Sequence, residues 1–247
     1  MKPAPNTTSL LATPAASSCR PLRRWLFALA AKMVMTASAA AQQQSPANQP
    51  ALMDRQQEIA LALSACPPFV VAKAAVYVLD QAGYVKVRDS QNGFTAIVQH
   101  SLPGAQEPRC MDAEGTRTHL PRILKVAELR AQGKSPDEIR RFVAEAFAKG
   151  IFQPPARPGV DYMLSTQNIV PNEKGVVSPY PPHVMFYAPF MTNADLGVDR
   201  TDLGPDGNPR SPAFVAGEGG PHALIIVPIG EHAGSGHVSS HRDAGVQ

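Results

Sequence analysis

The sequence lacks the short motifs that identify several large classes of enzyme. It has no Gly-x-Ser-x-Gly elbow, His-Glu-x-x-His motif, Cys-x-x-Cys pair, Walker loop or dinucleotide-binding glycine fingerprint. The nearest approach to a glycine-rich loop is Gly217-Glu218-Gly219-Gly220, which we interpret as a turn leading into the last strand. The sequence therefore assigns no enzyme class, although a site assembled from distant residues would leave no such motif.

Aromatic residues are also scarce, at 6% of the 247 residues, and the single tryptophan lies near the N-terminus. Three arginines precede an apolar run from Trp25 to Met35, which Lys32 interrupts, and small residues around Ala39 follow. This is the pattern of a signal peptide, and the run is too short to span a membrane. We predict a signal peptide over 1–41; the alternative is an uncleaved amphipathic anchor.

The remaining chain is divided by composition. Residues 42–50 are polar and contain proline, which predicts a flexible linker. Residues 51–230 carry the periodic apolar patterns and are predicted to form one domain, with no transmembrane helix in the mature chain. Residues 231–247 are rich in glycine, serine and histidine and predict a disordered tail. We expect the mature protein to be exported to the periplasm or secreted.

The basic charge belongs to the N-terminal segment. The whole chain has a formal charge of +3, but residues 1–41 hold five of its 23 basic residues and none of its 20 acidic ones. The remainder therefore carries a formal charge of −2. This balance gives no reason to expect nucleic-acid binding.

Cysteine is rare. Cys19 lies in the predicted signal peptide, so the mature chain keeps Cys66 and Cys110. In an oxidising compartment an even pair suggests a disulfide, which would close a loop of about 45 residues and add roughly 3–4 kcal/mol. Two buried free thiols are the alternative, and the sequence does not decide between them.

The periodic patterns predict helices and strands in a definite order. A helix over 52–65 is followed by three short strands, 75–80, 84–89 and 94–100, with Asn92-Gly93 as a hairpin signal. Two helices over 116–132 and 136–149 come next; the second opens with a capping box at Ser135. Beyond them lie further apolar runs, at Tyr162–Leu164, Val184–Ala188 and Ala223–Ile229, with a minor one at Phe214–Ala216.

This order predicts an α+β fold. We expect a mainly antiparallel sheet, made of an N-terminal three-stranded meander and two or three central strands. An N-terminal helix and a central helix pair complete the predicted domain. The strand at 84–89 alternates Lys86 and Arg88 with valines, which is typical of a half-solvated strand and offers an edge for contact with another envelope protein.

Two stretches of similar sequence supply the main site candidates, PHVMFYAP at Pro182–Pro189 and PHALIIVP at Pro221–Pro228. Their continuous apolar runs predict central strands buried on both sides, with His183 and His222 at the strand entries. A half-desolvated histidine there is placed to act as a general base or a ligand. The alternative is a structural histidine that bonds a loop carbonyl.

Strand direction decides whether the two histidines can share a site. Antiparallel neighbours would place His183 and His222 at opposite ends, about 20 Å apart; parallel or once-removed strands would place them on one rim. In the second case Tyr187, Asp161, Asp195 or Glu218 could complete a site. We expect the first arrangement.

A second cluster runs from Cys110 to Gly115, just before a predicted helix. Asp112 and Glu114 are expected to cap that helix, and the alternative is that they recognise a polar ligand together with Thr116, Arg117 and His119. In the tail, the spacing of His232, His237 and His241 does not fit a tight zinc site. We predict no metal site and no cofactor.

These observations favour a non-enzymatic module that binds a small ligand or an envelope protein. Its expected binding residues are Tyr162, His183, Tyr187 and His222. The alternative is a periplasmic hydrolase or metal-dependent enzyme that uses His183 and His222, with Glu218 as a candidate acid. The sequence leaves open whether the protein is an enzyme.

Overall fold

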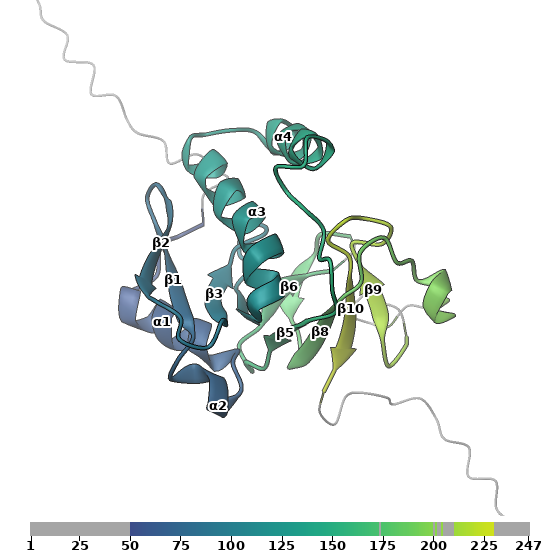
Figure 1. Ribbon diagram of the computed structural model, residues 1–247, viewed down its shortest axis with the longest axis horizontal. Helices are drawn as coiled ribbons and strands as arrows, with labels where there is room; N and C mark the ends of the chain where they lie inside the picture. The colour runs from purple at the N-terminus through teal and green to yellow at the C-terminus, as the bar shows by residue number, and fades with distance from the viewer. Residues whose placement is uncertain (1–49, 173, 200, 202–203, 205–209, 230–247) are drawn as a thin grey trace, which may run out of the picture. The chain divides into compact units, whose positions relative to one another are not determined.

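The structure is a computed structural model that describes residues 50–172, 174–199, 201, 204 and 210–229. The protein is α+β, with one sheet of eight strands in the order β2-β1-β3-β4-β5-β8-β10-β9. A separate hairpin is formed by β6 and β7. Figure 1 shows β1–β3 at one end of the large sheet and β8–β10 at the other, with α3 between them.

The elements begin and end close to the bounds that the apolar patterns predict, with three additional short strands and one additional short helix. The helices are α1 (Arg55–Ser64), α2 (Pro68–Val71), α3 (Ala113–Ala131) and α4 (Pro136–Ala148), with a 3-10 turn η1 at Ala194–Leu196. The strands are β1 (Ala75–Asp80), β2 (Gly83–Arg88), β3 (Thr95–Gln99), β4 (Glu107–Met111), β5 (Val160–Met163), β6 (Ile169–Pro171), β7 (Val177–Pro179), β8 (His183–Tyr187), β9 (Phe214–Ala216) and β10 (Leu224–Pro228).

The predicted N-terminal meander is wrong in its connectivity. β1 and β2 form an antiparallel hairpin, but β3 pairs in parallel with β1, and β2 is left as an edge strand. The segment with Asn92 and Gly93 crosses the start of β1 instead of turning back along β2. It is held there because Gln91 donates its N–H to the Lys73 carbonyl, and the Asn92 side chain donates to the Val70 carbonyl.

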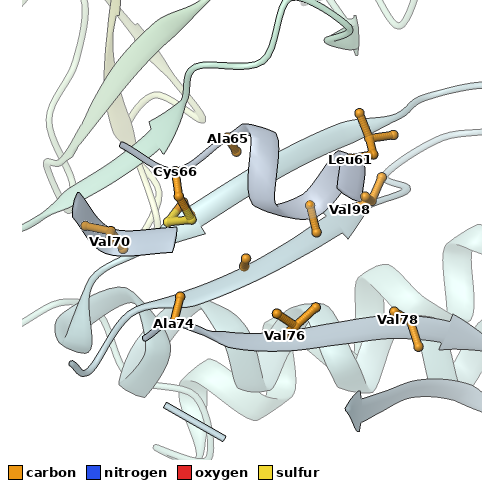
Figure 2. Close-up of a cluster of buried hydrophobic side chains, with 11 residues drawn as sticks. Leu61, Ala65, Cys66, Val70, Ala74, Val76, Val78 and Val98 are labelled. Atoms are coloured by element: carbon orange, nitrogen blue, oxygen red, sulfur yellow. A yellow bond between two sulfur atoms is a disulfide. The ribbon is translucent and has the colours of Figure 1, made fainter. Parts of the chain in front are cut away.

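One face of β1, β3 and β4 packs against α1. Figure 2 shows this core, in which Leu61 and Ala65 of the α1 segment face Val76, Val78 and Val98. Cys66 and Cys110 form a disulfide in the same core, with their Cα atoms 5.1 Å apart. The disulfide alternative is therefore the one observed, and it fastens the end of α1 to β4.

The opposite face of these strands packs against α3. Ile97 and Met111 of the sheet contact Leu120 and Ile123 of the helix. Asp112 caps α3 by accepting from the Gly115 N–H, as the sequence predicts. The predicted capping box of α4 is also confirmed, with Ser135 and Glu138 bonding reciprocally.

The second half of the sheet is covered differently from the prediction. In β8, His183, Met185 and Tyr187 are buried, whereas Phe186 on the other face is 44% exposed. The prediction that β8 and β10 are buried on both sides is thus wrong, because α1 packs mainly against β1, β3 and β4 on that other face. The buried face of β5, β8, β9 and β10 is the one that continues from beneath α3.

The edge strand β9 is protected by a side chain. Asn193, which is fully buried, donates to the Val215 carbonyl and accepts from the Val215 N–H at 2.8–3.0 Å. These two bonds occupy backbone groups that an edge strand otherwise offers to another chain. Glu218 holds Asn193 in place by accepting its backbone N–H at 2.8 Å.

Several predictions concern residues outside the described part of the chain. The signal peptide over 1–41, most of the linker over 42–50, and the tail over 231–247 with His232, His237 and His241 all lie there. Within the described ranges, no helix is both long enough and apolar enough to cross a membrane.

Candidate functional site: a cavity over the second half of the sheet

A cavity of about 290 Å³ lies on the buried face of the sheet, from β4 across to β9. The β6–β7 hairpin forms one of its walls. Its floor and walls are mainly apolar, with ionisable side chains at the β4 end and at the start of β8. The lining residues used below are Glu107, Arg109, Met163, His183, Met185 and Phe214.

The cavity opens where β4 and β5 separate. The two strands pair only at Cys110–Tyr162 and Met111–Asp161. Beyond these pairs β4 carries Pro108. Proline lacks a backbone N–H, so it suits a position where β4 makes no hydrogen bond to β5. The chain there instead bridges to β6, through Gln106 and Ile169. The separation leaves Arg109 facing the cavity.

Arg109 and Asp161 form a buried ion pair at the cavity floor. The guanidinium donates to Asp161 Oδ2 from both Nε, at 2.8 Å, and Nη2, and from Nη1 to Gln99 Oε1 at 2.8 Å. These contacts use three of the five N–H groups of an arginine. The remaining two, one on each terminal nitrogen, have no acceptor among the residues that the structure describes.

Glu107 lies beside this pair, and burial raises the pKa of its carboxyl group. Its oxygens accept from the Ser101 hydroxyl, from the Ser101 N–H at 3.1 Å and from the Gln99 amide at 3.2 Å. Gln99 thus connects Glu107 to Arg109. The β4 end of the cavity is therefore a fixed polar network.

His183 faces the cavity from the start of β8, and it is only 3% exposed. Its Nδ1 lies 2.9 Å from the Pro181 carbonyl. Because a carbonyl only accepts, Nδ1 carries the proton and Nε2 keeps a lone pair. Burial lowers the pKa of His183 to about 4, so the ring is neutral at pH 7.

His222 is half-buried and lies outside this cavity, in a stack of rings. Its ring stacks on His119 of α3, with centroids 4.1 Å apart, and Tyr187 lies on His119 at 4.8 Å. Its Nε2 donates to the Gln153 carbonyl at 3.0 Å. Burial lowers the pKa of His222 to about 4 and lowers that of His119 further.

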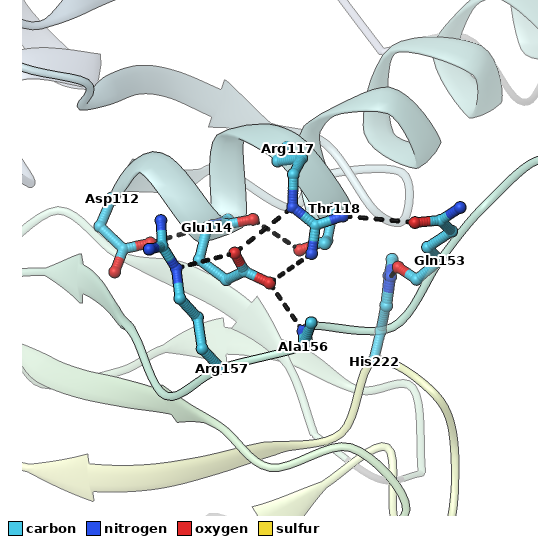
Figure 3. Close-up of polar contacts among 9 residues, drawn as sticks. Asp112, Glu114, Arg117, Thr118, Gln153, Ala156, Arg157 and His222 are labelled. Atoms are coloured by element: carbon cyan, nitrogen blue, oxygen red, sulfur yellow. Dashed lines mark hydrogen bonds and ion pairs between the residues drawn. The ribbon is translucent and has the colours of Figure 1, made fainter.

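Glu114 fastens the chain segment around this stack to α3. Figure 3 shows its carboxylate accepting from Arg117, from the Ala156 N–H at 2.7 Å and from Arg157 at 3.2 Å. The same segment supplies the Gln153 carbonyl to His222. Asp112 caps α3 as predicted, whereas the Glu114 carboxylate bonds Arg117 and the segment around Ala156 instead of an N–H group of the helix.

The arrangement expected from the sequence, in which His183 and His222 lie apart, is the one observed. β8 and β10 are antiparallel neighbours with Pro228 opposite His183 and Leu224 opposite Tyr187. His222 precedes Leu224 by two residues, so it lies about 20 Å along the strands from His183. Each histidine bonds a carbonyl outside its own strand, as the structural alternative describes. The two cannot contribute to one site.

The remaining candidates lie elsewhere. Tyr162 is on the opposite face of the sheet, stacked against Phe94 at 6.3 Å. Tyr187 is in the ring stack and donates to the Val160 carbonyl at 3.1 Å. Glu218 holds Asn193 at the β9 edge and does not line the cavity. Of the residues singled out from the sequence, only His183 lines the cavity.

Sequence reasoning missed Arg109 and Glu107, and it named Asp161 only as one of several acids that could complete a site shared by His183 and His222. The run Glu107-Pro108-Arg109-Cys110-Met111 has neither apolar alternation nor a β-branched residue, so it does not resemble a strand. The nearest signal is Cys110, since a disulfide to the N-terminal helix would place its neighbours near the core. His119 was named only as a possible contact for a polar ligand beside Asp112 and Glu114.

A second hollow in the described structure has no comparable polar groups free to bind a ligand. A hollow of about 430 Å³ beside α3 and β2 is lined by Lys125 and Glu128, which pair with each other at 2.8 Å. Among the described residues, no group of three or more histidine, cysteine, aspartate or glutamate side chains is placed to hold a metal ion. No protein-family model, curated protein or solved structure matches the chain.

Proposed function

We propose that the protein is an exported binding module that holds a small, mainly apolar molecule in the cavity over β4, β5, β8, β10 and β9. The observation that carries this proposal is the combination of a mainly apolar lining with two polar side chains, Arg109 and His183, that face the same cavity. A volume of about 290 Å³ is at the lower end of the range for ligand pockets, which are mostly apolar with few orienting polar groups.

The polar groups favour a ligand head that both accepts and donates hydrogen bonds. The two unused N–H groups of Arg109 offer donors, and the bare Nε2 of His183 offers an acceptor. Asp161 compensates the charge of Arg109, so the ligand head need not be charged. A neutral amide, which both accepts and donates hydrogen bonds, meets this requirement. The apolar body would contact Met163, Met185 and Phe214.

The hydrolase alternative loses its geometric basis, because it required His183 and His222 to converge. Export is supported by the disulfide between Cys66 and Cys110, since disulfides persist in oxidising compartments. Binding without catalysis is the simpler use of a cavity whose single histidine is neutral and tied to a carbonyl.

The test uses the methionine methyl groups as reporters. The chain has eight methionines, of which Met163 and Met185 line the cavity and Met111 packs under α3. With methyl-labelled methionine, octanamide should shift the signals of Met163 and Met185 and leave that of Met111 in place. The shifts should saturate as binding to one site requires.

Two variants locate the binding. Ala216→Trp fills the cavity from the edge strand and should abolish the octanamide shifts. Phe186→Ala removes an apolar side chain from the opposite face and should leave them unchanged. The absence of any saturable shift, or shifts that persist in Ala216→Trp, would count against the proposal.

A further inference from the structure

Two methionines and one histidine converge on the cavity floor. Met163 of β5 lies directly opposite His183 of β8, and Met185 follows His183 by two residues on the same face. Directly opposed side chains on a sheet have Cβ atoms about 4.5–5.5 Å apart, and diagonal neighbours remain within reach of long side chains. Met163 and Met185 belong to one contact cluster, and all three residues are 3% exposed.

The orientation of His183 matches that of a metal ligand. In metal sites, a ligating histidine donates its other ring N–H to a carbonyl or carboxylate, which fixes the ring and the tautomer. Here Nδ1 donates to the Pro181 carbonyl at 2.9 Å, while Tyr180 packs edge-on against the ring at 5.0 Å. Nε2, which has no partner among the described residues, is thus held toward the cavity.

We propose that Met163, Met185 and His183 form a binding site for a soft monovalent metal ion, Cu(I), on the cavity floor. Two thioethers and one imidazole are soft, neutral donors, and thioether sulfur selects Cu(I) over the harder divalent ions. A neutral donor set in an apolar wall also suits a single positive charge better than a double one. Zn²⁺ is disfavoured because, within the described ranges, these donors belong to no group of three or more histidine, cysteine or carboxylate side chains.

The metal site uses His183 and the two methionines that the proposed small molecule would also contact, so the two ligands would compete, but neither proposal requires the other to hold. The metal site also differs from the prediction of no metal, which considered histidine, cysteine and carboxylate spacings in the sequence. Met163 and His183 are 20 residues apart along the chain, and only the pairing of β5 with β8 brings them together.

The test is an anaerobic competition titration of Cu(I) against bicinchoninate. It uses the full chain with His232, His237 and His241 changed to glutamine, so that these tail imidazoles do not contribute. We expect one Cu(I) per chain, and X-ray absorption should show sulfur and nitrogen neighbours. Zn²⁺ in excess should not displace the copper.

Variants assign the donors. Met163→Leu, Met185→Leu and His183→Asn should each weaken Cu(I) binding by about tenfold or more, because losing a ligand costs at least as much as losing its outer-shell partner. Met111→Leu is the matched control, because Met111 is a buried methionine that packs against α3 away from the site. This variant should bind Cu(I) as tightly as the parent does. Leucine for methionine is close to volume-conserving, so these variants should fold.

Different results of these experiments support or overturn the metal site. Absence of stoichiometric Cu(I) binding would overturn the proposal, as would unchanged affinity in the folded Met163→Leu/Met185→Leu double variant. Ag(I), a redox-inert soft ion, should bind with the same dependence on the three residues. Octanamide binding without Cu(I) binding would leave the ligand cavity standing and reject the metal site.

Discussion

The imidazole rings of buried His119 and half-buried His222 stack face to face, with centroids 4.1 Å apart and planes inclined by 14°. His119 is fully buried, and neither of its ring nitrogens has a hydrogen-bond partner within the described chain. A buried polar atom without a partner costs about 1–3 kcal/mol. This ring pair is therefore held together at the expense of stability.

Replacing His119 by phenylalanine should stabilise the protein. The change keeps a flat ring against His222 and Tyr187 while removing two unsatisfied nitrogens, so we expect a gain of about 1–3 kcal/mol at pH 7. Chemical denaturation measures it. A less stable variant would show that His119 has a favourable polar contact in the folded protein.

The same histidines predict a loss of stability in mild acid. Burial lowers the pKa of His222 from 6.5 to about 4 and that of His119 further, while Arg109 and Arg122 add positive charge nearby. Below pH 6.5 both histidines are protonated in the unfolded chain but remain neutral in the folded protein. Stability is therefore fully present above pH 6.5 and falls between pH 6.5 and 4, by about 1.4 kcal/mol per pH unit for each such histidine.

His119→Phe provides the comparison for this pH effect. Over the same pH interval the variant should lose less stability than the parent. The difference should be up to about 1.4 kcal/mol per pH unit, which is the contribution of one histidine. Denaturation curves at pH 7, 6, 5 and 4.5 measure both proteins. Parallel pH profiles would mean that His119 does not titrate on unfolding as described.

The Arg109–Asp161 ion pair should be sensitive to the loss of either partner. Asp161→Asn leaves a buried guanidinium without its counter-charge, and we expect it to destabilise the fold by about 3–5 kcal/mol. The double change Arg109→Met/Asp161→Leu removes both charges and should cost much less than the two single changes together. Additive losses in this cycle would show that the two groups do not interact.

Gly115 should resist replacement by alanine, although it lies in the first turns of α3. A methyl group added there would overlap the Tyr187 hydroxyl and come within 2.7 Å of the ring carbon that bears it. Glycine to alanine in an open helix gains about 0.5–1 kcal/mol, whereas overpacking costs about 1–3 kcal/mol. We expect a net loss for Gly115→Ala, measured by thermal unfolding. Combining it with Tyr187→Leu should restore part of the loss.

The disulfide should contribute about 2–4 kcal/mol to stability. Cys66 and Cys110 are 44 residues apart, so their bond restricts a large loop of the unfolded chain. Cys66→Ala/Cys110→Ala should unfold at lower denaturant concentration than the oxidised parent. Reductant should lower the midpoint of the parent and leave that of the variant unchanged.

Local patterns predicted most of the helices and strands because each pattern is decided by neighbours in the chain. The hairpin between β1 and β2, the Asp112 cap and the Ser135 capping box all depend on residues within a few positions of one another. Pairing between distant strands has no such signal. The Asn92–Gly93 segment illustrates this, since it could turn back beside β2 or cross to the other side of β1.

The residues that share the cavity with His183 could not be predicted either, because they are brought together by pairing between distant strands. His183 stood out by its place before an apolar run, but its neighbours Met163 and Arg109 belong to strands whose order the sequence does not fix. Glu107 and Arg109 lie in a buried strand that carries charge, and such a strand has no apolar pattern by which to be recognised.

What the sequence determined by itself is the α+β class, the bounds of the principal helices and strands, and the cysteine pair that could form one disulfide. These follow from propensity, apolar periodicity and composition. The tertiary structure alone decided that His183 and His222 lie at opposite strand ends, that His222 stacks on His119, and that Arg109, Met163 and His183 share one cavity. The physical reason is that strand order and direction follow from packing of the whole sheet against α1 and α3, and no short stretch of residues carries that information.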